Sequence, residues 1–416
     1  MRVLLLNQCF YPDVVSTAQH LTDLAVRLAD LGHEVTVLAG RRGYDNPELR
    51  FRKREVWRRI TVLRISATHF GKTTRWRRAL DFGSYLAACA FRLLLLPRFD
   101  AVFALTSPPL ISLLGALFVK LKGGRLFIWV MDLNPDEAVA AGWLRRGSVV
   151  ERTLASALRY SFECAGKVIA LDRFMKGRIV EKGIPEERIV VIPPWPHDDV
   201  VHFDPAGRAA FRSVHGLDCK YVVMYSGNHS PCHPLNTLLE AAASLHRHPE
   251  IHFCFVGGGT EFEKTRAFAR DRGLANVTCL PYQPLKDLSA SLSAADLHVI
   301  VMGDSFVGLV HPCKIYNVLS VGSSFLYIGP RDSHVTDIIC GLGNSLEIRQ
   351  AAQGDAVTVA RHILDLYRRS SAQRPEMQKS AAAGYSKETL LPRITQLVAS
   401  AQSALPDLPW LRRIHP

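Results

Sequence analysis

A lysine at the end of a polar, glycine-containing loop is the first candidate for chemistry in this chain. The loop follows an apolar run, 295–302, that reads as a buried strand, and it leads through Pro312 into the segment 314–319. Proline is favoured at the first position of a helix. Unpaired amides and the helix dipole favour negative charge at that end, and Lys314 adds a positive charge there. The pattern predicts a diphosphate site; an ordinary strand-to-helix connection with a surface lysine is the alternative.

Asp132 is the second candidate, because it closely follows the apolar strand-like run 126–130. Active sites of α/β proteins gather at the carboxyl ends of their strands. A carboxylate there can orient an acceptor hydroxyl or assist its deprotonation. Helix capping by Asp132 or Asp136, without chemistry, is the alternative interpretation.

Two further loops also follow predicted strands. Gly257 and Gly259 come after the run 251–256, and glycine lets backbone approach a ligand closely; a flexible turn is the alternative. The loop from Tyr11 to Ser16 follows the first strand and is expected to face a ligand cleft, although it reads equally as a plain turn. It lacks the G-x-G-x-x-G pattern of a dinucleotide site.

The elements that must position these residues alternate between strands and helices. The segment 2–6 reads as a strand, 19–31 as an amphipathic helix ended by Gly32, and 35–38 as the next strand, which predicts a parallel sheet. A second series of the same kind starts at Tyr221, after a proline-rich run at 192–196. We therefore expect an α/β protein with two doubly wound, Rossmann-like domains facing a central cleft. The expected boundaries are 1–200 for the first domain, 201–219 for a linker, 220–390 for the second domain, and 391–416 for a helical tail packed on the first domain.

The composition narrows the class of protein. The 416 residues are 48% hydrophobic and 21% charged, which is typical of a globular chain with room for two domains. The nine cysteines are scattered and form no C-x-x-C pair, so reduced thiols are favoured over disulfides, zinc ligation or a catalytic thiol. The apolar run after Met1 is too short for a signal peptide, which favours the cytoplasm.

Positive charge is concentrated between Arg50 and Arg98. This region holds eleven arginines and two lysines against Glu55 and Asp81, and so contributes +11 of the formal net charge of +13. Its apolar run, 85–96, is amphipathic rather than long enough to span a membrane. Basic residues interleaved with aromatic ones predict contact with an anionic membrane surface. Nucleic acid is the rival partner, but no nucleic-acid-binding signature is present. A solvated basic surface over a core helix is the remaining alternative.

In their order and spacing, six segments resemble GT-B glycosyltransferases, most closely the family 4 enzymes that build bacterial surface polysaccharides. The segments are 5–12, 32–38, 132–136, 225–228, 255–259 and 312–316. The resemblance implies a nucleotide-sugar donor held mainly by the second domain. It also implies a retaining transfer without a bound metal or other cofactor, to a lipid-linked or oligosaccharide acceptor. We expect a hexosyltransferase-type enzyme, peripheral on the inner face of the plasma membrane.

The resemblance also assigns residues. We expect catalytic roles for Asp132 and Lys314. In the family the region of Tyr282 carries backbone contacts to the base, so Tyr282 is a candidate for stacking on it; a packed loop aromatic is the alternative. The expected substrate-binding residues are Tyr11, Ser16, Gly227, Asn228, His233, Gly257, Gly259, Tyr282, Gly308, His311 and Asn317. No metal ligand is expected: the sequence has no D-x-D pair, and Pro231 separates His229 from His233.

The chain departs from the family pattern at two places. Where many family 4 enzymes carry two glutamates, it has Leu309 and Asn317, and Asn228 and His233 stand where an arginine and a lysine often grip the diphosphate. His233 can still donate to phosphate, and Asn317 can still bond a ribose hydroxyl. Two alternatives to a transferase therefore stay open. One is a non-catalytic nucleotide-sugar-binding subunit, and the other is a GT-B-fold epimerase that cleaves the donor with water.

Overall fold

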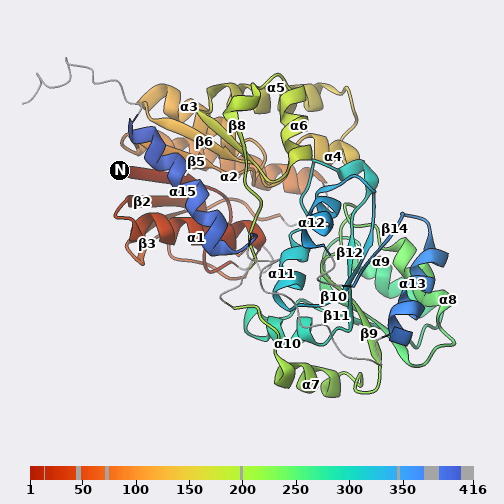
Figure 1. The fold of residues 1–416 in the computed structure, drawn as a ribbon. Helices are drawn as coiled ribbons and strands as arrows, with labels where there is room; N and C mark the ends of the chain where they lie inside the picture. The colour runs from red at the N-terminus through yellow and green to blue at the C-terminus, as the bar shows by residue number, and fades with distance from the viewer. Residues whose placement is uncertain are drawn as a thin grey trace, which may run out of the picture. The chain divides into compact units, whose positions relative to one another are not determined.

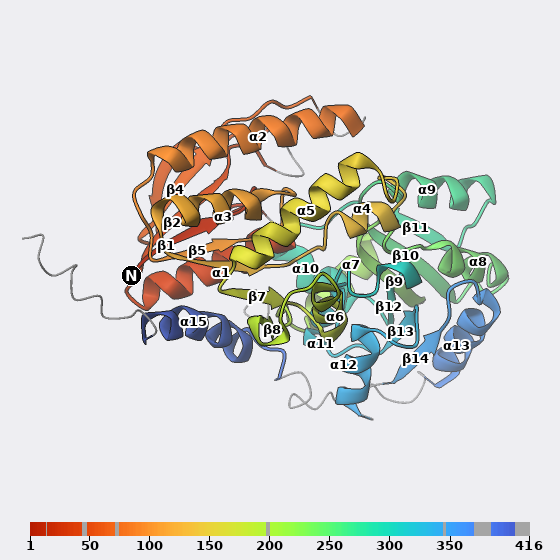
Figure 2. The same ribbon diagram turned by 90° about the horizontal axis from the view of Figure 1, so that it is seen from above.

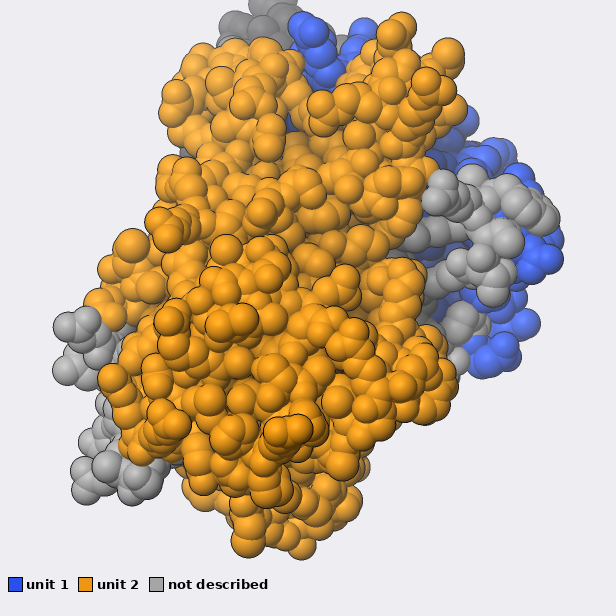
Figure 3. All heavy atoms as spheres, turned by 90° about the vertical axis from the view of Figure 1, so that its right-hand side faces the viewer, with its two compact units in different colours: residues 1–129, 157–169, 388–416 blue, residues 130–156, 170–387 orange. Residues whose placement is uncertain are grey.

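The computed structural model describes residues 1–13, 15–43, 48–70, 75–196, 200–343, 347–369 and 384–403. The chain forms two compact α/β units, which are coloured separately in Figure 3. Unit 1 comprises residues 1–129, 157–169 and the chain from 388 onward, and unit 2 comprises 130–156 and 170–387. Residues 71–74 of the basic region and 404–416 of the expected tail lie outside the described residues. The domain boundaries expected from the sequence stay a prediction.

The first sheet is mostly parallel (Figure 1). Its strand order is β3 (Arg54–Trp57), β4 (Ile60–Ile65), β2 (Glu34–Gly40), β1 (Arg2–Leu6), β5 (Ala101–Ala104), β6 (Arg125–Trp129), β7 (Lys167–Ala170) and β8 (Ile189–Val191). The basic strand β3 is antiparallel to β4. The α-helices between β1 and β8 in the chain are α1 (Ser16–Asp30), α2 (Arg75–Leu95), α3 (Ile111–Lys122), α4 (Asp136–Ala140), α5 (Val149–Cys164) and α6 (Arg173–Glu181). The last helix, α15 (Lys387–Ser403), lies beside α1 in unit 1 (Figures 1 and 2).

The second sheet lies in unit 2 and is parallel throughout. Its order is β11 (Val277–Leu280), β10 (Ile251–Gly258), β9 (Tyr221–Asn228), β12 (Leu297–Val301), β13 (Phe325–Ile328) and β14 (Ile348–Ala351). Its helices are α7 (Pro205–Val214), α8 (Asn236–Ser244), α9 (Phe262–Asp271), α10 (Leu288–Ser293), α11 (Lys314–Ser320), α12 (His334–Leu342) and α13 (Ala356–Arg369). Read from β9 outward, the order is that of a doubly wound sheet, which reverses direction between β9 and β12.

Local sequence explains most of these elements. In α1 the residues Leu21, Leu24, Ala25 and Leu28 follow helical spacing and are fully buried, as predicted. The central strands β9 and β12 are mostly apolar and buried, because helices cover both faces of a parallel sheet. The predicted fold class, two Rossmann-like α/β sheets, is confirmed. Within the described ranges, no helix has the length and mean hydropathy needed to cross a bilayer.

Candidate functional site

The carboxyl ends of β9 and β10 meet beside the point where the strand order of unit 2 reverses, which is where doubly wound sheets bind ligands. Gly227 on β9 lies opposite Gly257 on β10. Both glycines have positive φ angles, 136° and 140°. A side chain on Gly257 would overlap the backbone of Gly227, and one on Gly227 would overlap the stem of Lys314. Glycine is therefore required here, because it lets Lys314 cross β9 in close contact with the backbone.

Lys314 is the first residue of α11 and the main charged group at this edge. Its ammonium donates to the Tyr225 hydroxyl at 2.6 Å and to the Asn228 carbonyl at 3.4 Å, and lies 4.5 Å from the centre of the Tyr225 ring. Desolvation lowers the pKa of Lys314 to about 7. A diphosphate placed here would favour the charged form and raise that pKa again.

The helix starts later than the sequence predicts. We expected Pro312 at its first position, but α11 begins two residues further on, at Lys314. The buried His311 explains the difference, because it is held between Asp172 and Tyr316 and ties the preceding segment to other elements. The later start leaves Lys314 itself at the helix N-terminus.

Two histidines, His233 and His229, are close enough to Lys314 to interact with its charge. His233 donates from Nδ1 to the Val301 carbonyl at the end of β12, at 2.8 Å, and His229 donates from Nδ1 to the Gly227 carbonyl at 3.0 Å. Burial, together with the charge of Lys314, lowers the pKa of His229 to about 4 and that of His233 well below its usual value. Both rings are therefore neutral at neutral pH. For His233 to donate to a phosphate, as predicted, its Nε2 must gain a proton.

Asn228, Gly259 and Tyr282 also lie at the carboxyl ends of the strands of the second sheet. Asn228 is exposed at the end of β9, and a side chain on Gly259 would overlap its amide. Tyr282 is half-exposed and donates to the Gly258 carbonyl at 3.3 Å. Asn317 lies one helical turn after Lys314 on α11. The structure thus brings together most of the residues that were assigned to the donor.

Gly308 and His311 are held by contacts with other parts of unit 2. Gly308 has a positive φ of 73°, and a side chain there would press against the backbone of Phe174 on α6. His311 donates from Nδ1 to Asp172 and accepts from the Tyr316 hydroxyl, both at 2.7 Å. These contacts anchor the loop before Lys314. A direct role of the two residues in substrate binding stays a prediction.

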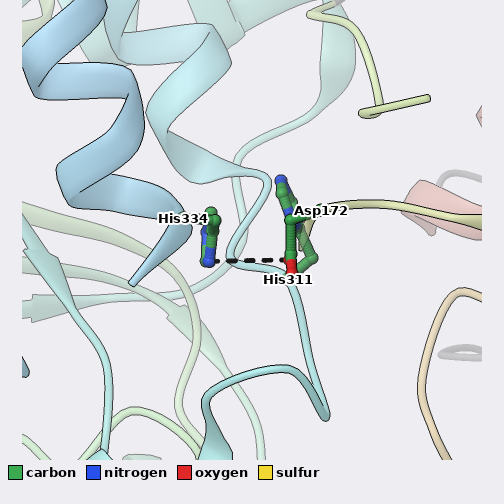
Figure 4. A group of neighbouring side chains, drawn as sticks. All are labelled: Asp172, His311 and His334. Carbon is green, nitrogen blue, oxygen red and sulfur yellow. Dashed lines mark hydrogen bonds and ion pairs between the residues drawn. The ribbon is translucent and has the colours of Figure 1, made fainter. Parts of the chain in front are cut away.

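Asp172, His311 and His334 form a buried cluster (Figure 4). Their residue types and their spacing, within 4.8 Å, are those of metal ligands. However, the two imidazole rings stack face to face, with centres 3.9 Å apart and planes inclined by 27°. Imidazole nitrogens bind a metal in the ring plane, and nearly parallel planes share no such point nearby. We interpret the cluster as structural. Asp172 caps α6 by accepting a hydrogen bond from the Met175 amide, and it also accepts one from His311.

Asp132 interacts with a second acidic residue, Glu137, which no sequence pattern indicates as functional. Burial, and then the negative charge of Glu137, raise the pKa of Asp132. Glu137 accepts from the Asn134 amide at 2.9 Å and from the Cys232 thiol at 3.8 Å. Burial, and then the negative charge of Glu137, raise the pKa of that thiol well above its ordinary value. Asp132 therefore binds a proton more readily than an ordinary carboxyl, and both acids belong to unit 2, as Lys314 does.

Tyr11 and Ser16 lie in unit 1. Tyr11 stacks on Trp57 with ring centres 4.1 Å apart, and Ser16 begins α1, where its hydroxyl is 3.3 Å from His20. Neither residue lines the pocket of about 80 Å³ that unit 1 forms at the carboxyl ends of β1, β2 and β4. The lining residues include Gln8, Gly40, Arg41, His69, Asp81 and Tyr85. The Gln8 side-chain oxygen is buried there and has no hydrogen-bond partner among the described residues, so it can accept a bond from a ligand hydroxyl.

Known proteins resemble the chain along most of its length. Residues 17–195 match the model of a glycosyl transferase 4-like domain, and residues 208–309 match that of the glycosyl transferases group 1. WcaI of Escherichia coli K12, a glycosyl transferase assigned to colanic acid biosynthesis, is 26% identical over 343 residues, which cover 78% of this chain and 82% of WcaI. The glycosyltransferase WbjE of Pseudomonas aeruginosa is 23% identical over 310 residues, 73% of this chain and 76% of WbjE.

Solved structures share the fold at low identity. Anabaena HepE, in complex with UDP and glucose, superimposes with a TM-score of 0.71 at 16% identity, over 97% of this chain and 100% of HepE. The lipopolysaccharide glycosyltransferase WaaG gives a TM-score of 0.65 at 16% identity, over 95% of this chain and 99% of WaaG.

The two doubly wound sheets and the two family matches define a glycosyltransferase of the GT-B fold. The chain belongs to the family 4 glycosyltransferases. The predicted family and enzyme class are confirmed.

Substituting Gly227 with alanine should weaken donor binding by about tenfold. The new methyl group overlaps the stem of Lys314, which must move away from its contacts with Tyr225 and Asn228; one displaced charge-assisted contact is worth about 1.5–3 kcal/mol. Isothermal titration with the donor measures the change.

Gly216→Ala is the matched control. Gly216 lies in the same unit and also has a positive φ, 65°, but an added methyl group there meets nothing within 4 Å. The substitution therefore introduces alanine at a positive φ without the clash. Equal donor affinity in the Gly227 and Gly216 variants would contradict the placement of Lys314 in the donor site.

Proposed function

We propose that this enzyme transfers a sugar from a nucleotide-sugar donor to a lipid-linked or polysaccharide acceptor, with retention of configuration and without a bound metal. The observation that carries the proposal is Lys314, packed across Gly227 at the switch point of unit 2. A nucleoside diphosphate gains negative charge as the glycosidic bond breaks, and a fixed cation aimed at that charge lowers the barrier. In metal-dependent transferases a divalent ion stabilises the negative charge of the leaving group.

The acid pair supports the acceptor side of the proposal. Burial and the negative charge of Glu137 raise the pKa of Asp132, which belongs to the same unit as Lys314. In its ionised form, a carboxyl group of this kind orients an acceptor hydroxyl and receives its proton late in the transfer. Retention of configuration is proposed from the family; proton NMR of the product, which distinguishes the two anomers by their coupling constants, tests it.

The relatives support the kind of acceptor. WcaI is named for colanic acid biosynthesis, and WaaG for lipopolysaccharide biosynthesis. Polymers of this kind are assembled at membranes, and the basic region 50–98 favours a place on the inner face of the plasma membrane. HepE has UDP in its structure, which makes UDP-sugars the first donors to try.

Incubation with UDP-, GDP- and dTDP-sugars, in the presence of a metal chelator, tests the function. We expect one donor to be consumed, slowly with water and faster once an acceptor is added. Release of a free, epimerised sugar would instead indicate an epimerase. Binding without turnover on any acceptor would indicate the non-catalytic subunit, which the replacement of both family glutamates by Leu309 and Asn317 keeps open.

A further inference from the structure

The outward face of α2 is apolar although it does not pack against the protein. Leu80, Ala87, Phe91 and Leu94 are exposed and follow each other at helical spacing. The opposite face is apolar as well, with Tyr85, Cys89 and Leu93 buried against unit 1. Packing of the core explains the buried face only. The exposed face therefore needs a separate explanation.

Helix α3 extends this surface. It packs beside α2 within unit 1 (Figure 2), and its Leu117 and Leu121 are exposed at a spacing of one turn. We call the combined surface the α2–α3 face. It consists of Leu80, Phe91, Leu94, Leu95, Leu117 and Leu121, whose exposed fractions run from 41% to 70%.

The charges around this face have one sign. The exposed basic residues Arg77, Arg98, Lys120 and Lys122 border it. Between residues 75 and 124 the sequence has two acidic residues, Asp81 and Asp100. Both are bound to other parts of unit 1: Asp81 accepts from the Phe70 amide and the Thr68 hydroxyl, and Asp100 from the Arg2 amide. The border of the face is therefore positively charged.

Two arginines elsewhere in the basic region, Arg64 and Arg59, are already paired with acidic residues. Arg64 is buried and bonds Glu55 at 2.6 Å and the Tyr11 carbonyl at 2.7 Å, and Arg59 pairs with Asp30 at 3.0 Å. Electrostatic attraction by region 50–98 as a whole is thus weaker than its formal charge suggests. The α2–α3 face adds what the charge count lacks, exposed apolar side chains on two helices that pack together.

We propose that the α2–α3 face inserts into the headgroup and acyl boundary of an anionic bilayer, with α2 lying in the plane of the membrane. An apolar face with a cationic border is the pattern of an interfacial helix. A second copy of the chain is a poorer occupant, because two such faces in contact would bring their positive borders together.

The position of α2 connects this face with the pocket of unit 1. Asp81, Phe82 and Tyr85 of α2 line that pocket, while the outward residues of the same helix enter the bilayer. A lipid-linked acceptor could then stay in the membrane while its polar head enters the pocket beside it. This last step rests on the proposed function, whereas the docking face itself does not.

Vesicle flotation tests the proposal without any substrate. The variant Phe91→Ser/Leu94→Ser/Leu121→Ser removes apolar surface and leaves every basic residue in place. On vesicles of phosphatidylglycerol and phosphatidylethanolamine we expect its partition coefficient to fall by about tenfold or more relative to the wild type. The difference should persist at about 1 M salt, where the Debye length is only about 3 Å. Equal binding of the two proteins would overturn the proposal.

A matched control and a second variant keep the test decisive. Val214→Ser/Val357→Ser removes valines that are 79% and 80% exposed in unit 2, and should bind vesicles like the wild type. Phe91→Trp should show a blue-shifted difference spectrum on these vesicles, quenched by brominated acyl chains. Absence of both changes would overturn the insertion. So would a wild-type dimer, seen by sedimentation without lipid, that the triple serine variant abolishes.

Activity separates this proposal from the proposed function. The triple serine variant should transfer sugar to a short, water-soluble acceptor at the wild-type rate, because its substitutions lie on the outer face of α2 and α3. Loss of vesicle binding with this activity intact supports the docking face. Vesicle binding by a protein that consumes no donor would refute the function and leave the docking face standing.

Discussion

Replacing Lys314 with methionine should lower the rate of sugar transfer by about a hundredfold or more, since preorganised groups that stabilise a leaving-group charge contribute about 10²–10³ to the rate. The ammonium is fixed by the Tyr225 hydroxyl and by the crossing over Gly227. Methionine keeps most of the aliphatic stem and removes the charge. Because that charge is desolvated in the folded protein, the free energy of unfolding should stay the same or rise.

Lys264→Met is the control for this variant. Lys264 lies in the same unit, is 74% exposed, and pairs with Glu261 on the surface. It should retain wild-type transfer and stability. A Lys314→Met enzyme with the wild-type rate would show that the diphosphate is stabilised by other groups, whereas a loss of folding together with activity would mark the lysine as structural.

The lowered pKa of Lys314 also predicts a dependence on pH. The pKa falls from the ordinary 10.5 to about 7 in the folded protein, so the ammonium is fully charged only below that value. Donor affinity should therefore decrease as the pH rises above 7. Over the same window, from about 7 to 10.5, the unfolded chain binds more protons than the folded one, so the free energy of unfolding should rise with pH. Both trends should disappear in Lys314→Met, as titrations and denaturant curves at several pH values would show.

Substituting Asp132 with asparagine should slow transfer by about a hundredfold while donor affinity changes little, because positioned acid–base groups contribute about 10²–10⁴. The carboxyl is assigned to the acceptor, whereas the donor contacts come from Lys314 and the glycines at the ends of β9 and β10. Rates at saturating donor, together with the donor dissociation constant, measure the two effects separately. Equal activity in variant and wild type would exclude Asp132 from the reaction, and no capping role would remain, because α4 has Pro135 at its N-cap and no side-chain cap bond.

Glu137→Gln provides an independent readout of the acid pair. The negative charge of Glu137 raises the pKa of Asp132, so its removal should lower that pKa. If Asp132 acts in its ionised form, the acid limb of the pH–rate profile should move to lower pH in Glu137→Gln. A profile that keeps its position would separate Asp132 from the reaction, since a purely structural defect changes the height of the profile and not its midpoint.

The sequence was sufficient for features that depend on local pattern. The βαβ series, the buried face of α1 and the strand before Lys314 follow from apolar periodicity, which reports burial directly. The glycines at 257 and 259 are expected from the sequence either to let backbone approach a ligand or to form a flexible turn; the structure shows their positive φ angles, and the approach to a ligand stays a prediction. The sequence pattern does not predict strand β3, because this short strand contains basic residues and lacks an apolar run. It is stabilised by antiparallel pairing with β4 rather than by its own hydrophobicity.

Contacts between distant residues were beyond the sequence pattern. The bond from His311 to Asp172 joins residues 139 positions apart, and the thiol of Cys232 meets Glu137 across 95 positions. Neither spacing has a periodic signature. The same holds for the α2–α3 face: composition suggested an amphipathic helix, but only the fold shows that both sides of α2 are apolar and that α3 widens the exposed one.

The most direct test of the donor site is an isothermal titration of the wild type and Lys314→Met with the nucleoside diphosphate of the preferred donor, in the presence of a metal chelator. We expect saturable binding at one site in the wild type, and a dissociation constant at least about tenfold higher in the variant, since one charge-assisted contact is lost. Binding of equal strength in the two proteins, or binding that requires a divalent metal, would contradict the account of Lys314 as the group that holds the diphosphate.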